Sequence, residues 1–154
     1  MGTLKVFKNN LNVSPFADGK YWYLLEDFIW EPNEGAPITV PKGFVTDFAS
    51  IPRPLWAILP TWAKYGPASV VHDFLYWEQS DGINRLRADE IMLEAMQDLN
   101  VSPLACRVIY IGLRLAGKYT WCVNQKKKGK GYKKIITNFP TQLSETWESY
   151  RTKK

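Results

Sequence analysis

The chain changes its sequence pattern once, and this change limits the folds that it can adopt. Over residues 1–50, apolar and aromatic residues occur in short runs such as TLKVF and PITVPKGFV, with turn signals at residues 18–19 (DG) and 32–35 (PNEG), as is typical of β-strands. Over residues 54–117, apolar residues recur every three to four positions, which indicates helices. Strands followed by helices predict an α+β fold, in which N-terminal antiparallel strands pack against about three α-helices.

Three helices are predicted within the second pattern. The first covers residues 67–80, because Pro67 is suited to the first turn of a helix. The second covers residues 87–99, where apolar residues form one stripe. The third covers residues 102–117, with Gly117 at its end. A chain of 154 residues without an internal repeat or a long linker predicts a single domain.

The composition narrows the class of protein. Apolar residues make up 45% of the chain and aromatic residues 14%, which excludes a disordered protein. No stretch approaches the roughly 18 apolar residues of a transmembrane helix, and the N-terminus has no pattern of a secretory signal. We therefore expect a soluble protein made in the cytoplasm. In that setting the two cysteines, Cys106 and Cys122, are expected to be free thiols rather than a disulfide.

The positive charge is concentrated in one segment. The net charge is +5, and the stretch KKKGKGYKK (residues 126–134) holds six lysines, so the rest of the chain has a charge of −1 (5 − 6). This lysine segment could bind an acidic partner, nucleic acid or a membrane surface. The alternative is a solvated, mobile loop without a partner. The remainder of the chain offers no basic face for nucleic acid.

The only histidine of the chain, His72, lies in the apolar run VVHDFLYW (residues 70–77). On a helix, Tyr76 follows it on the same face, and Asp73 lies about 100 degrees away. His72 could act as a general base that activates water, and Asp73 could bind a hard cation such as Ca²⁺ or Mg²⁺. The alternative is a buried histidine with one structural hydrogen bond and a carboxylate that faces solvent.

Two further stretches offer partners for His72. The loop TDFASIPR presents Asp47 as a second carboxylate, Ser50 as a hydroxyl and Arg53 as a group that binds anions. Alternatively, Asp47 or Ser50 caps a short helix near residues 54–59. Asp89 lies in the first turn of the second helix, where the helix dipole alone already favours a carboxylate.

The order of the stretches VPKGFVTDFASIPRPLW, YGPASVVHDFLYW and RADEIMLEAM resembles the phage and prophage family called domain of unknown function 1353. The resemblance covers residues 38–117. It implies a phage or prophage origin, with synthesis in the host cytoplasm and a place in the virion or in takeover of the host. It implies no particular activity.

A second resemblance concerns the site alone. HD-x-x-Y on a helix, followed by an Asp on a later helix, is similar to the active site of phospholipase A2, and most of all to the form found in parvovirus capsid proteins. It implies that His72 activates water, that Asp73 binds calcium, and that Asp89 supports His72 and is hydrogen-bonded by Tyr76. The chain departs from that pattern before the helix, where KYGPAS holds one glycine instead of a glycine-rich calcium loop.

These stretches together predict a phage-encoded protein with one polar cleft, across which TDFASIPR faces the helix of His72. In the first hypothesis the protein is a metal-assisted hydrolase, with Asp47, Asp73 and Asp89 as ligands of a cation such as Ca²⁺ or Mg²⁺. His72 would then be the base, and Arg53 would neutralise developing negative charge. In the second hypothesis the same residues form a structural polar network, and the protein is a non-catalytic virion or tail-assembly component that contacts other virion proteins.

Overall fold

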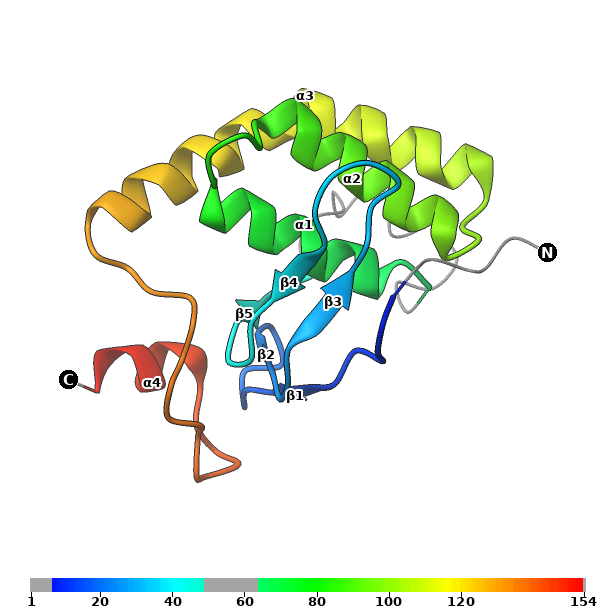
Figure 1. Ribbon diagram of the computed structural model, residues 1–154. Coiled ribbons are helices and arrows are strands. Elements are labelled where there is room, and N and C mark those ends of the chain that lie inside the picture. The colour runs from blue at the N-terminus through cyan, green and yellow to red at the C-terminus, as the bar shows by residue number, and fades with distance from the viewer. Residues whose placement is uncertain (1–6, 49–63, 154) are drawn as a thin grey trace.

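The structure is a computed structural model that describes residues 7–48 and 64–153 (Figure 1). Its strands are β1 (Val13–Pro15), β2 (Trp22–Leu24), β3 (Phe28–Trp30), β4 (Ile38–Val40) and β5 (Val45–Thr46). Its helices are α1 (Gly66–Glu78), α2 (Arg85–Asp98), α3 (Pro103–Gly129) and α4 (Trp147–Thr152). The predicted α+β fold with N-terminal antiparallel strands is confirmed, and a short fourth helix follows near the C-terminus.

The strands form two small antiparallel sheets, one with the order β1-β2-β5 and one made by the β3–β4 hairpin. The predicted turn at residues 18–19 joins β1 to β2: Asp18 Oδ1 accepts from the backbone N–H groups of Lys20 (2.9 Å) and Tyr21 (3.2 Å), and Gly19 has φ +64°. The central strand β2 pairs with β5 through Tyr23 and Val45. This pairing places the end of β5, and the loop that follows it, next to the helices.

The first and third helices begin within one residue of the predicted positions, whereas α2 begins two residues before the predicted start, so Asp89 lies beyond its first turn. Pro67 lies in the first turn of α1, and the side chains of Asn84 and Ser102 accept hydrogen bonds at the N-termini of α2 and α3. The predicted end of the third helix is wrong: α3 continues through Gly117 to Gly129. The reason is that Gly117 is buried against α1, so its lack of a side chain serves close packing rather than helix termination.

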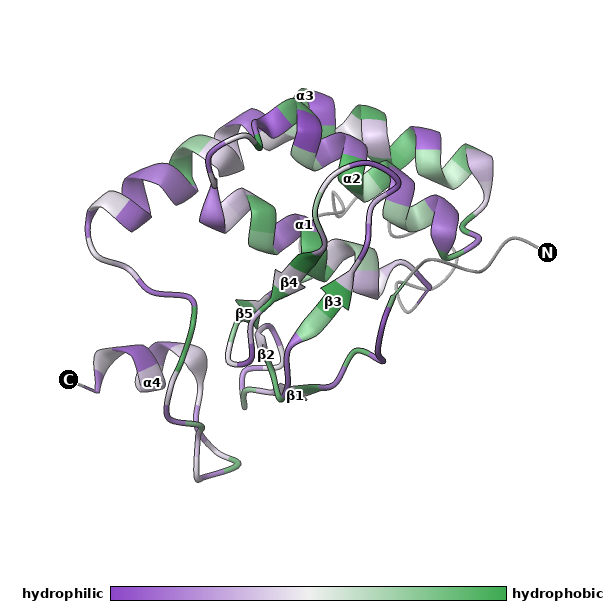
Figure 2. Cartoon of the chain, in the orientation of Figure 1, coloured by the Kyte–Doolittle hydropathy of each residue, from purple (hydrophilic) through white to green (hydrophobic). Residues whose placement is uncertain are grey.

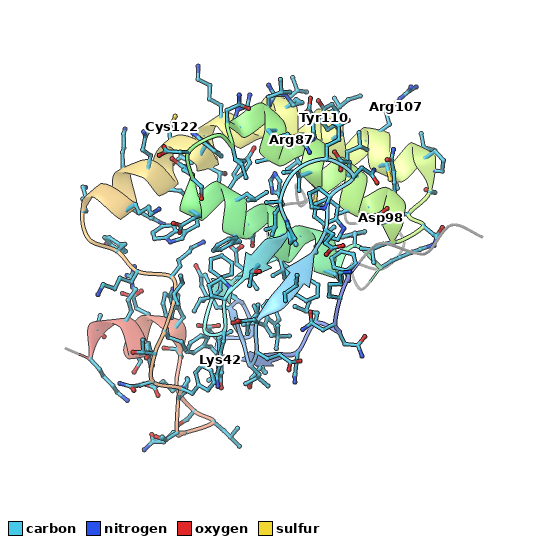
Figure 3. All side chains as sticks on the ribbon, in the orientation of Figure 1. Lys42, Arg87, Asp98, Arg107, Tyr110 and Cys122 are labelled. Carbon is cyan, nitrogen blue, oxygen red and sulfur yellow. The ribbon has the colours of Figure 1, made fainter. Side chains whose placement is uncertain are left out.

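The three long helices lie together on one side of the strands (Figure 1). The main core lies between these helices and the hairpin, and its largest buried side chains include Trp30, Phe28, Phe44, Met92 and Ile109. The indole N–H of Trp30 donates to the carboxylate of Asp98 at 3.1 Å, which ties β3 to the C-terminal end of α2. Asp98 is labelled in Figure 3. The hairpin and the helices thus form one packed unit.

The lysine segment is fixed to the sheet. Its first half is the last turn of α3, the hydrophilic end of that helix in Figure 2. Beyond the helix, the backbone carbonyl of Lys134 accepts from the N–H of Val45 in β5 (2.7 Å), and the N–H of Ile136 donates to the carbonyl of Gly43 (2.9 Å). Gly43 has φ +82° and lies so close to Ile136 that a Cβ would overlap its backbone. The segment therefore runs beside β5 toward the second core cluster, which holds Phe16 and Trp147.

The expectations for the cysteines and for membrane-spanning helices can be compared with the structure. Cys106 and Cys122 are both free thiols, Cys106 buried and Cys122 half-buried on α3 (Figure 3). Within residues 7–48 and 64–153, no helix has the length and apolar character needed to cross a bilayer.

Candidate functional site

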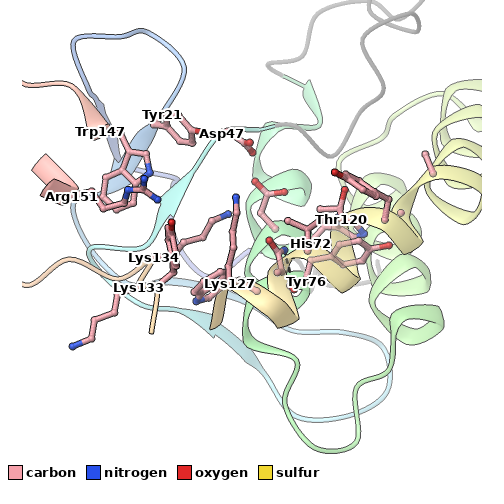
Figure 4. A pocket seen from close by; sticks show the side chains of 18 of the residues that line it. Tyr21, Asp47, His72, Tyr76, Thr120, Lys127, Lys133, Lys134, Trp147 and Arg151 are labelled. Atoms are coloured by element: carbon pink, nitrogen blue, oxygen red, sulfur yellow. Dashed lines mark hydrogen bonds between the residues drawn. The ribbon is translucent and has the colours of Figure 1, made fainter. Parts of the chain in front are cut away.

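A groove of about 580 Å³ runs between α1, α3, the loop after β5 and the C-terminal segment (Figure 4). His72 and Tyr76 of α1 lie at one end of it, and Trp147 and Arg151 of α4 lie at the other. Its lining combines carboxylates, lysines and aromatic rings, among them Asp47, Asp73, Lys127, Lys134, Tyr21 and Tyr132. With the β1–β2 turn, which supplies Tyr21, five segments far apart in the sequence contribute to one concave surface.

Behind the groove, His72 is held by Asp89 of α2. The Nε2 atom of His72 lies 2.9 Å from Oδ1 of Asp89, and the hydroxyl of Tyr76 donates to the same oxygen at 2.7 Å. His72, Tyr76 and Asp89 are 1%, 3% and 0% exposed, so these hydrogen bonds are shielded from water. Since His72 and Tyr76 are one helical turn apart, α1 presents both to a single carboxylate.

The second oxygen of Asp89 is bound by two arginines. Oδ2 accepts from Nη1 of Arg114 (2.7 Å) and from Nη1 of Arg85 (3.4 Å), and Arg85 also donates to the backbone carbonyls of Leu113 and Arg114. Burial would raise the pKa of Asp89, but the hydrogen bonds from His72, Tyr76 and Arg114 outweigh it and hold this pKa below its ordinary value. Asp89 is therefore a carboxylate, an acceptor only, so Nε2 of His72 donates and the lone pair of a neutral ring lies on Nδ1.

Tyr76 is fixed from several sides. Burial and the hydrogen bond to Asp89 raise its pKa, so the hydroxyl stays protonated and donates. The backbone carbonyl of Tyr76 accepts from Asn124 (3.1 Å) and Gln79 (3.0 Å), and its ring meets Trp121 of α3 edge to face. Its hydroxyl occupies the space that a Cβ at Gly117 would need. Glycine at this position lets α3 cross α1 at the tyrosine.

Asp73 faces the end of β5. Its Oδ2 accepts from the hydroxyl of Thr46 at 2.6 Å, and the same Thr46 oxygen accepts from the backbone N–H of Phe48 at 3.2 Å. Thr46 is completely buried, and the next residue, Asp47, lines the groove together with Asp73. The loop after β5 is thus attached to α1, and two carboxylates lie on the groove side of His72.

The predicted site residues divide into three groups. Asp47, His72, Asp73 and Tyr76 line one groove. Asp89 contacts His72 from the opposite side, where four side-chain donors occupy its oxygens. Ser50 and Arg53 lie outside the described residues.

The set of three carboxylates predicted as cation ligands does not come together. Asp89 is directed at His72 and the two arginines instead of at Asp47 and Asp73, because its oxygens accept from those donors. In the part of the chain that the structure describes, no group of three or more His, Cys, Asp or Glu side chains could hold a metal ion.

Several residues of the site escaped the sequence analysis. Arg85 lies four residues before Asp89 on α2, a spacing that the sequence analysis did not use. Arg114 is ordinary in its helical context, and only the packing of α3 on α2 directs it to Asp89. Gly117 carried a signal, since a glycine inside an apolar helical run indicates either an end or a close contact. Thr46 was visible in TDFASIPR, and its position directly after β5 is what aims it at α1.

A comparison with known protein families finds a match over the part of the chain that holds most of the site. The model of the family described as "Protein of unknown function (DUF1353)" matches residues 22–113, more than half of the 154 residues. That range includes β2 to β5, α1, α2 and residues 103–113 of α3, and with them His72, Asp73 and Asp89. No curated protein and no solved structure is significantly similar to the chain. The chain belongs to the DUF1353 family.

Proposed function

We propose that this protein is a hydrolase in which His72 is the general base and Asp47 and Asp73 bind a hard divalent cation in the groove. The observation that carries the proposal is the buried hydrogen bond of 2.9 Å between His72 and Asp89. It orients the ring and fixes its tautomer, while His72 also borders the groove that holds both carboxylates. A histidine oriented from behind by a carboxylate is a recurring arrangement for a base.

The reaction would proceed by attack of water on an ester. Nδ1 of His72 accepts a proton from the water, its oxygen bonds to the electrophilic centre, and the bond to the leaving oxygen breaks. The protonated ring then returns the proton to the leaving alkoxide. Asp89 stabilises the positive ring that forms in between, and it stays ionised because Arg85 and Arg114 hold its other oxygen. A cation at Asp47 and Asp73 would polarise the ester oxygen that becomes negative.

A second candidate is a non-catalytic component of a phage virion or tail. One observation favours it: the Asp89 network connects α1, α2 and α3, as a purely structural cluster would. Another is the outer face of α3, which exposes large apolar side chains suited to contact with another protein: Leu104, Ile111, Leu115 and Tyr119. In this case the lysine segment would serve as a contact for an acidic partner.

The test compares two substitutions at His72. His72→Gln keeps an N–H donor near the position of Nε2 and removes the base, whereas His72→Ala removes both. Hydrolysis of p-nitrophenyl butyrate and of bis(p-nitrophenyl) phosphate is followed with Ca²⁺, with Mg²⁺ and with a chelator, next to thermal unfolding. We expect the parent to hydrolyse an ester only with a cation, and His72→Gln to remain folded and lose at least about 100-fold in rate.

Asp73→Asn should lose the activation of hydrolysis by the cation, and Glu34→Gln, which changes an exposed carboxylate outside the groove, serves as the matched control. Equal rates for the parent and His72→Gln would refute the role of the base. A parent that is inactive under every condition, together with a His72→Ala variant that fails to fold, would favour the structural candidate.

A further inference from the structure

Lysines line the groove between its two ends. Lys127 comes from the last turn of α3, and Lys133 and Lys134 come from the segment beside β5. In Figure 4, Lys127 and Lys134 stand between the end at His72 and Tyr76 and the end at Trp147, whereas the side chain of Lys133 points away. Two ammonium groups from different segments therefore share one stretch of the groove.

The backbone around these two lysines is fixed. The carbonyl of Lys127 accepts from the N–H of Tyr132 (3.1 Å), which closes the turn after α3, and the carbonyl of Lys134 accepts from Val45 (2.7 Å). The ammonium of Lys134 lies 5.5 Å from the centre of the Trp77 ring, a cation–π contact with α1. Both side chains start from anchored positions, unlike lysines on a mobile loop.

Within the described parts of the chain, neither lysine forms an ion pair with a carboxylate, although Asp47 and Asp73 line the same groove. Other lysines do: Lys8, Lys128 and Lys153 form ion pairs with Glu31, Glu78 and Glu145. Of the acidic groups at the far end of the groove, Asp18 accepts three backbone N–H groups and Glu148 pairs with Arg151. A helix dipole explains why lysines gather in the last turn of α3, but Lys134 lies beyond that helix.

We propose that Lys127 and Lys134 bind the phosphate of a phosphate-bearing ligand in the groove. Two ammonium groups that line one groove and form no ion pair within the described residues suit an anion with several acceptor oxygens. The inference deepens the proposed function, on which its catalytic part rests: the substrate is an ester that carries a phosphate, with the scissile bond at His72 and the phosphate at the lysines. The cation held by the carboxylates would then contact the ester end of the ligand, and the lysines would contact its phosphate.

Binding without turnover tests this inference apart from catalysis. The probes are glycerol 3-phosphate, measured by calorimetry, and vesicles of phosphatidylglycerol with phosphatidylcholine vesicles as reference, measured by sedimentation. They are applied to the parent and to His72→Gln, so a failure of hydrolysis does not affect the result. Lys127→Ala/Lys134→Ala removes the site, and Lys126→Ala/Lys130→Ala removes the same charge from lysines that do not line the groove.

We expect saturable binding to one of the probes, equal in the parent and in His72→Gln, and weakened about tenfold or more by Lys127→Ala/Lys134→Ala. The control double variant should stay within about twofold, and added salt should weaken binding of the parent. Binding of glycerol 3-phosphate identifies a soluble phosphate ester, and binding of phosphatidylglycerol vesicles alone identifies a lipid headgroup. An equal loss in both double variants, or no saturable binding to either probe, overturns the proposal.

Discussion

Replacing Gly117 by alanine should destabilise the protein, although the same change stabilises most helices. In a helix interior alanine is favoured over glycine by about 1 kcal/mol. At Gly117, however, an added Cβ would come closer than 3.0 Å to the hydroxyl oxygen of Tyr76, which Asp89 holds in place. If Tyr76 moves away, the buried hydrogen bond to the carboxylate is lost, at a cost of about 1.5–3 kcal/mol. The balance predicts a net loss of about 0.5–2 kcal/mol in the free energy of unfolding.

The control for this prediction lies on the same helix. Gly129 is the last residue of α3, and a Cβ there would meet no atom within 4 Å, so Gly129→Ala should leave the stability unchanged or raise it. Both variants are measured by urea unfolding against the parent. A further variant isolates the cause, since Tyr76→Phe removes the hydroxyl with which the added Cβ collides.

In the Tyr76→Phe background, Gly117→Ala should therefore cost less than in the parent, and the difference is the coupling energy between the two positions. The reasoning is refuted if Gly117→Ala is as well tolerated as Gly129→Ala. It is also refuted if the cost of Gly117→Ala is the same with phenylalanine as with tyrosine at position 76.

Three other predictions concern the polar contacts of the site. Asp89→Asn leaves His72, Arg85 and Arg114 without their carboxylate and should lower the free energy of unfolding by about 3 kcal/mol, measured by urea unfolding. Since the pKa of Asp89 is lower in the folded than in the unfolded protein, its contribution is present above the unfolded value, about 4, and is lost as the pH falls through the folded value. The stability gap between the parent and Asp89→Asn should therefore narrow in acid, and a constant gap would contradict the ionised state of Asp89. Thr46→Val removes the 2.6 Å hydrogen bond to Asp73 and should cost about 1 kcal/mol by thermal unfolding, whereas Thr39→Val, on an exposed position of β4, should cost little.

The sequence was sufficient for the fold class because local patterns determine it. Turn residues at 18–19 and 32–35, and the apolar periodicity after residue 54, act within a few positions of the chain. The end of α3 was misplaced because Gly117 has two possible meanings in a helix. The choice between them depends on Tyr76, which is 41 positions away (117 − 76) and meets it only after α1 and α3 pack together.

The site also combines features that local patterns show with contacts that only the packing of the chain creates. His72, Asp73 and Tyr76 were found from their spacing on one helix, and the relation of Asp89 to His72 was available only through a resemblance. Arg85 lies one helical turn before Asp89, a spacing that the sequence does show. The contact of Arg114 with Asp89 and the course of the lysine segment, where Lys134 pairs with Val45, depend on residues far apart in the chain. No single-sequence pattern encodes such pairs, because each residue is unremarkable in its own segment.

The geometry of Asp89 also determines which experiments on His72 are informative. One carboxylate holds the candidate base and at the same time connects α1, α2 and α3, so any change that empties the position of Nε2 weakens the fold together with the site. Loss of activity in His72→Ala is then expected whether the histidine acts as a base or only as a structural donor. His72→Gln separates these roles, because its amide N–H can still donate to Asp89 while no ring nitrogen remains to accept a proton. A folded, inactive His72→Gln variant of an active parent therefore supports catalysis by His72 in a way that the alanine variant does not.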